Sequence, residues 1–153
     1  MVMKKFLAFA CAAVLLAGCG SSEPKKETKT CSMEEAGMKM SIKMDAEDDV
    51  IKKMEMSYVF PGSMLGGDVS KLKEDDLKTM GDAVLSQLGI KEGEGIAAVF
   101  KADGKDLKAT INIDLTKADT DILKKQFKME GNTKNIKLSE TVKSGEADGA
   151  TCK

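Results

Sequence analysis

Apolar and polar residues alternate along two stretches in the first half of the chain. The period of two begins at Met38 and runs to Met44, and it returns between Met54 and Phe60. Because successive side chains of a strand point to opposite faces, each stretch predicts a strand with one apolar face. The acidic segment 45–49 between them suits a tight hairpin turn. The apolar positions are Met38, Met40, Ile42, Met44, Met54, Met56, Tyr58 and Phe60.

A helical spacing of apolar residues replaces this pattern in the middle of the chain. It predicts an amphipathic helix that ends at Gly89, with acidic residues 74–76 placed favourably in its first turn. The apolar positions of this helix are Leu77, Met80, Val84, Leu85 and Leu88.

The second half of the chain predicts another hairpin, followed by two short helices. Alternating residues from Ile96 to Phe100 and from Leu107 to Leu115 flank the turn sequence Asp103-Gly104. Short helices are expected within residues 118–129 and 141–147, with Ser139 as a candidate N-cap for the second. Strands with one apolar face need cover on that face and tolerate water on the other. The expected class is therefore α+β, an antiparallel sheet of two β-hairpins with helices packed on one face.

The N-terminal residues have the three parts of a secretory signal. Lys4 and Lys5 precede a short apolar run, which closes on Leu16-Ala17-Gly18-Cys19. The run is shorter than the roughly 20 residues that a membrane-spanning helix needs. Its last four residues resemble the lipobox of bacterial lipoproteins, which implies cleavage between Gly18 and Cys19 and a diacylglyceryl group on Cys19.

This interpretation divides the chain into a signal peptide (1–18), a lipidated flexible tether (19–30) and a single domain (31–153). The tether residues are small, polar and charged, as in flexible linkers. The expected location is the extracytoplasmic face of the cell membrane, where the lipid bilayer is the first partner and the acylated N-terminus holds the domain.

Composition removes several classes of function. The chain has no histidine, and all of its 24 basic residues are lysines. Histidine-based catalytic triads, histidine-ligated zinc sites and arginine-lined anion pockets are therefore excluded. A net charge of -1 does not favour a nucleic-acid partner. A non-enzymatic protein without a cofactor is expected, and a hydrolase that uses paired carboxylates is the alternative from the enzyme class.

Two cysteines remain for the domain once Cys11 leaves with the signal and Cys19 is acylated. Cys31 and Cys152 lie at the two ends of the domain, where a disulfide in an exported protein would join them. Two free thiols and a redox-active pair stay open as alternatives. The chain has no Cys-X-X-Cys spacing to favour redox chemistry.

Methionine is abundant, with 11 residues in the chain. On one face of paired strands, thioethers would suit cuprous copper, although the same face must form the core and methionine packs well there. The alternative metal set is Met38, Met40, Met44, Met54 and Met56. The acidic turn with Asp45, Glu47, Asp48 and Asp49 lacks the frame of a calcium loop, and a solvated turn is expected.

The order of these features resembles the YehR-like lipoproteins. The matching features are the lipobox, the tether, Cys31 before a first hairpin, the central helix, residues 108–115 and 117–119, and the ending Leu138-Ser139-Glu140-Thr141-Val142-Lys143 with Cys152-Lys153. The resemblance implies a small α+β lipoprotein domain of unknown function, and it brings no catalytic or ligand residues. Gly145 and Gly149, which interrupt the terminal helix, depart from the family pattern, as do the methionines of the first hairpin.

The expected function is that of a membrane-anchored lipoprotein whose domain binds a partner of unknown identity at the cell envelope. Soft-metal binding through the methionine face is the alternative function.

Overall fold

The computed structural model describes residues 23–35, 37–127 and 132–153. The predicted signal peptide, the cleavage point between Gly18 and Cys19, and the lipidation of Cys19 lie outside the described residues. They stay predictions. Within the described part, no helix has the length and apolar character needed to cross a bilayer.

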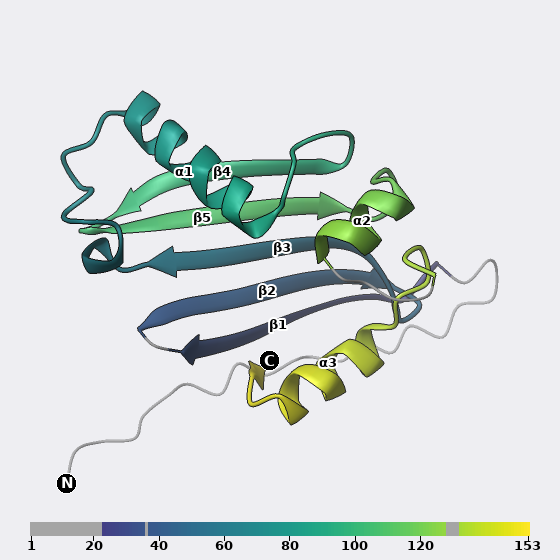
Figure 1. Cartoon of the computed structure of the whole chain (residues 1–153). Helices are drawn as coiled ribbons and strands as arrows, with labels where there is room; N and C mark the ends of the chain where they lie inside the picture. The colour runs from purple at the N-terminus through teal and green to yellow at the C-terminus, as the bar shows by residue number, and fades with distance from the viewer. Residues whose placement is uncertain (1–22, 36, 128–131) are drawn as a thin grey trace, which may run out of the picture.

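One antiparallel sheet of six strands forms the centre of the fold, in the order β4-β5-β3-β2-β1-β6 (Figure 1). Among the described residues, three α-helices and one 3-10 turn accompany the sheet, and the α+β class is confirmed. The elements are β1 (Lys26–Glu35), β2 (Met38–Glu47), β3 (Val50–Phe60), η1 (Gly62–Met64), α1 (Glu74–Leu88), β4 (Ile96–Asp103), β5 (Asp106–Asp114), α2 (Thr120–Phe127), α3 (Leu138–Ala147) and β6 (Thr151–Cys152).

The acidic turn between β2 and β3 contains only two residues outside the strands. Asp48 and Asp49 have φ angles of 49° and 66°, the left-handed conformation that two-residue hairpin turns require. Aspartate tolerates this conformation better than most residues with a side chain. At the other end of the sheet, Gly104 has a φ of 62° in the turn between β4 and β5.

Strand β1 extends into the predicted tether. It begins at Lys26 and pairs with β2 along its whole length, so the boundary expected between residues 30 and 31 is displaced by five residues. Cys31 therefore lies in the middle of a strand. The reason is local pairing, because threonine favours strands and the backbone groups of residues 26–30 hydrogen-bond to β2.

The two faces of the sheet differ in chemistry. Inward residues of β2, β3 and β5 alternate with mostly polar residues, of which Ser57 is buried, and Met44, Ile51, Ile111 and Ile113 are almost completely buried. Helices add Leu77 and Leu85 from α1, Leu123 from α2 and Leu138 from α3 to the two hydrophobic clusters. Strands and helices thus both contribute to the hydrophobic core.

Helix α1 ends where the sequence predicts. Gly89 follows its last residue in the left-handed conformation, with a φ of 71°, and its N–H donates to helix carbonyls. The glycine in α3 behaves differently from the prediction. Helix α3 continues through Gly145 and ends at Ala147, with Asp148 as its C-cap, so Gly145 does not interrupt the helix.

The start of α3 is held by the turn between β2 and β3. Ser139 is not the N-cap, because the helix begins one residue earlier, at Leu138. Its backbone N and its Oγ each donate a hydrogen bond of 2.8 Å to the Asp49 carboxylate. The Leu138 N–H donates to the Asp49 carbonyl at 2.8 Å. An aspartate 90 residues away therefore satisfies the first turn of the helix.

Candidate functional site

The two remaining cysteines meet at the edge of the sheet. Cys31 on β1 lies opposite Cys152 on β6, with 1.97 Å between the Sγ atoms and 4.0 Å between the Cα atoms. On the adjacent pair, Thr30 and Lys153 exchange two backbone hydrogen bonds of 2.9 Å. The structure thus brings the predicted cysteine pair to disulfide distance and fixes the C-terminus on β1.

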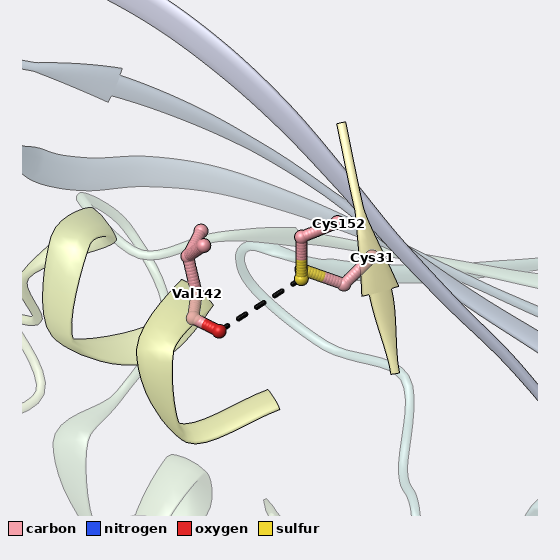
Figure 2. The surroundings of a disulfide bond; sticks show 3 residues. All are labelled: Cys31, Val142 and Cys152. Atoms are coloured by element: carbon pink, nitrogen blue, oxygen red, sulfur yellow. Dashed lines mark hydrogen bonds between the residues drawn. A yellow bond between two sulfur atoms is a disulfide. The ribbon is translucent and has the colours of Figure 1, made fainter. Parts of the chain in front are cut away.

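Helix α3 packs directly over these sulfur atoms (Figure 2). Cys152 Sγ lies 3.8 Å from the carbonyl oxygen of Val142. A disulfide sulfur has no proton to donate, so this contact is van der Waals packing. A side-chain Cβ at Gly145 would lie 3.8 Å from Cys152 Sγ and 3.9 Å from Cys31 Sγ. The helix therefore passes close to the disulfide at a residue that has no side chain.

A pocket opens beside this contact, between α3 and strands β1, β2 and β3. Its volume is about 220 Å³, and its wall is mainly apolar. The lining residues are Cys31, Ser32, Met33, Met40, Ser41, Ile42, Met44, Tyr58, Thr141, Gly145, Asp148 and Ala150. Asp148 is the one charged residue in this lining. We call this site the methionine pocket.

The pocket divides the methionines that the sequence grouped together. Met40 and Met44 line it, whereas Met38, Met54 and Met56 do not. Met54 is 7% exposed and belongs to the core beside Met44, its partner across the strands. All five do project from the same face, because β2 and β3 pair in the register that alternation requires.

Met33 was missed by the sequence analysis. It lies directly opposite Met40 across β1 and β2, and both residues line the pocket. The sequence gives only a weak indication of this role. Cys31 and Met33 alternate in an otherwise polar segment ahead of the turn at Gly37, which places both on one face of a strand.

Tyr58 gives the pocket an aromatic wall. Its ring stacks on that of Phe60, with 6.1 Å between the ring centres and 23° between the planes. Burial raises the pKa of the Tyr58 hydroxyl above its usual 10.0, because the phenolate would lose hydration. Tyr58 thus stays neutral at physiological pH and adds apolar surface with a polar tip.

The acidic turn does not assemble an oxygen cage. Asp45 accepts a hydrogen bond from Thr28, Asp48 accepts one from the backbone N of Lys25, and Asp49 binds Ser139. Ser139 lowers the pKa of Asp49, first through its backbone N–H and then through its hydroxyl group. In the described part of the chain, no group of three or more acidic or cysteine residues is arranged to hold a metal ion.

Comparisons with known proteins bear on the fold. No protein-family model and no curated protein matches the chain. The YehR protein of Escherichia coli, solved by NMR, is similar in structure, with a TM-score of 0.63 and 18% identity over 86% of this chain and 93% of that chain. An NMR structure of a protein from Streptococcus pneumoniae TIGR4 has a TM-score of 0.55 and 13% identity, and the match covers all of both chains.

The chain has a YehR-like fold. At these identities the likeness concerns the fold alone, and the lipoprotein character expected from the sequence stays a prediction.

Proposed function

We propose that this chain is a lipid-anchored envelope protein whose domain binds apolar side chains of a protein partner in the methionine pocket. Residues 1–18 act as the signal peptide, Cys19 carries the lipid, and the bilayer is the first partner. The domain is a non-enzymatic interaction module, built as a six-stranded sheet in which β2–β3 and β4–β5 are hairpins and β1 and β6 complete one edge, with helices on one face. The pocket is the part of that face which the helices leave open.

The character of the pocket carries this proposal. A volume of about 220 Å³ lies below the range of roughly 300–1,000 Å³ that small-molecule sites occupy. It suits one or two apolar side chains, which serve as buried anchors in protein interfaces. Methionine adapts its shape to different partners because it is unbranched and flexible. The disulfide and α3 hold one wall of the pocket, so the anchor enters a preformed site.

The short tether favours a partner that lies close to the membrane. Six residues, 20–25, separate Cys19 from the start of β1. A flexible segment of that length has a root-mean-square reach of roughly 13 Å. The domain would therefore sit against the lipid headgroups, and its partner would be a membrane protein or another anchored protein.

Site-specific photo-crosslinking in cells tests this proposal. A photoreactive residue at position 40 would lie in the pocket, and one at position 43 of the same strand would lie on the opposite, exposed face. We expect a discrete protein adduct from position 40 alone, and we expect Gly145→Leu, which fills the pocket, to abolish it. Adducts with lipid only, or equal adducts from both positions, would contradict the proposal.

The anchor is tested separately by intact-mass analysis of protein purified from its native membrane. The expected chain begins at diacylated Cys19 and has two thiols that react with an alkylating reagent only after reduction. An unlipidated chain would refute the anchor. Two thiols that react before reduction would refute the disulfide.

Soft-metal binding is the second candidate, and one observation favours it. Met33 and Met40 lie opposite each other across β1 and β2, and Met44 lines the same pocket, so three thioethers border one cavity. If cuprous ion binds there, Met33→Leu with Met40→Leu should abolish the thermal shift it causes. Met64→Leu is the matched control, since Met64 is 58% exposed and lies outside the pocket. Equal shifts in all three proteins would refute the metal site.

A further inference from the structure

The face of the sheet that points away from the hydrophobic core carries a row of hydroxyl side chains, in which Ser57 is 9% exposed. The strand register places Thr151 beside Ser32, Ser32 beside Ser41, Ser41 beside Ser57, and Ser57 beside Thr110. The row crosses β6, β1, β2, β3 and β5 in order, over roughly 19 Å at the usual spacing between strands. Ser57 Oγ and Thr110 Oγ1 are 3.5 Å apart.

This row forms the floor of a hollow. A cavity of about 520 Å³ is lined by Ser32, Ser41, Ser57 and Thr151 together with Met33, Glu34, Lys39, Met40, Val59, Lys108 and Gly149. A second hollow of about 270 Å³ is lined by Val99, Lys101, Lys108 and Thr110. Lys108 lines both, so the two hollows are neighbours at this residue. We call them together the hydroxyl trough.

The charge of the trough is opposite to that of the chain. Its lining includes three lysines and one glutamate, a balance of +2, whereas the whole chain carries -1. The acidic residue, Glu34, lies opposite Lys39 across β1 and β2. The positive charge is therefore concentrated at the other end, at Lys101 and Lys108.

Lys101 and Lys108 lie directly opposite each other on β4 and β5. Like charges so placed destabilise a sheet. The ion pairs recorded within the described residues involve other lysines: Lys25, Lys29, Lys78 and Lys117. Asp103 and Asp106 form the next pair on the same face, two positions along, and the Asp106 carboxylate already accepts a hydrogen bond of 2.9 Å from the Gly62 N–H. A bound anion would relieve the repulsion between the two lysines.

We propose that the hydroxyl trough binds an extended polymer that carries both hydroxyl and phosphate groups. Hydroxyls on the ligand exchange hydrogen bonds with the serine and threonine row, and a phosphate lies between the ammonium groups of Lys101 and Lys108. An uncharged sugar polymer would leave the lysine pair unrelieved, and the lining offers it no aromatic ring for stacking. The linings of the trough and the methionine pocket share Ser32, Met33, Met40 and Ser41, whereas Lys101 and Lys108 belong to the trough alone.

Binding of poly(glycerol phosphate) to the purified domain tests the proposal. We expect saturable, salt-sensitive binding that Lys101→Ser with Lys108→Ser weakens at least about tenfold, since each hydrogen bond to a charged group is worth roughly that factor. Lys124→Ser with Lys125→Ser, which makes the same charge change on α2, should alter affinity less than about twofold. Ser41→Ala with Ser57→Ala should weaken binding without a change of charge.

Other probes separate the alternatives. Equal affinity for inorganic polyphosphate would overturn the role of the hydroxyl row. Binding only to vesicles that contain phosphatidylglycerol would assign the lysines to a membrane surface and overturn the proposal. Equal losses of affinity in the two double-lysine variants, or no binding of poly(glycerol phosphate), would also overturn the proposal. The Lys101 and Lys108 variant should unfold at the same temperature as the parent or higher, which excludes loss of folding as the cause.

Discussion

Two helix glycines give the sharpest test of the packing, because alanine should have opposite effects at them. Gly145 lies in α3 over the disulfide, and Gly81 lies in α1. A Cβ at Gly145 would make ordinary van der Waals contacts at 3.8 Å and 3.9 Å. A Cβ at Gly81 would lie 2.1 Å from Cγ of Phe100, at the root of the ring.

The magnitudes follow from these contacts. Alanine stabilises a helix interior by about 0.5–1 kcal/mol relative to glycine, mainly because the unfolded chain loses freedom. Gly145→Ala should therefore raise the free energy of unfolding by about 0.5–1 kcal/mol, or the melting temperature by about 4 °C for a domain of this size. At Gly81 the same gain is opposed by overpacking, which costs about 1–3 kcal/mol. Gly81→Ala should therefore lower the free energy of unfolding by up to about 2 kcal/mol.

Urea unfolding of the parent and both variants measures these differences. The midpoint should rise for Gly145→Ala and fall for Gly81→Ala, with an unchanged slope. Phe100→Leu, which removes the ring, should reduce the cost of Gly81→Ala, so the two effects should not add. If Gly145→Ala lowered the stability, the packing of α3 against Cys31 and Cys152 described above would be wrong.

Three further predictions concern the disulfide, the turn and the pocket. Replacing Cys31 and Cys152 by serine should lower the free energy of unfolding by up to about 5 kcal/mol, because the unfolded chain is no longer constrained by a loop of 121 residues. Urea unfolding would measure this loss, with a fully reduced sample of the parent as the control. The pKa of Asp49 is lowered in the folded protein, so its interactions with Ser139 stabilise the fold above pH 3.8 and are lost as the pH falls through the folded pKa. Asp49→Asn should therefore make the urea midpoint of unfolding depend less on pH in the acid range. Tyr58 is the only tyrosine, so the ultraviolet absorbance of phenolate should titrate above pH 10.0 in the folded protein and return to 10.0 in urea; a folded value at or below 10.0 would contradict its burial.

The sequence predicts the regular strands well because their alternation is strong. The apolar positions of β2, β3 and β5 lie on one face as expected, since the period of two fixes the direction of each side chain. Gly89 and Gly104 end a helix and form a turn because glycine adopts the left-handed conformation without strain. These are local properties, and the neighbouring residues decide them.

The remainder depends on contacts between distant segments. Strand β1 is mostly polar, and pairing with β2 makes it a strand rather than a tether. Gly145 remains helical because α3 packs against the disulfide, which compensates for the low helix propensity of glycine. The methionine pocket combines Met33, Met40 and Gly145 from three separate elements, so no periodicity in the sequence indicates it.

The methionine pocket as a binding site for a partner's apolar side chain is the central claim of this account. Its most direct test is a titration of the parent protein and Gly145→Leu with a peptide from the crosslinked partner segment, followed by the fluorescence of Tyr58 in a chain without tryptophan. We expect saturable binding to the parent and a loss of affinity of at least about tenfold when leucine fills the pocket, the cost of losing one buried apolar anchor. Equal affinity of the two proteins for the peptide would contradict it.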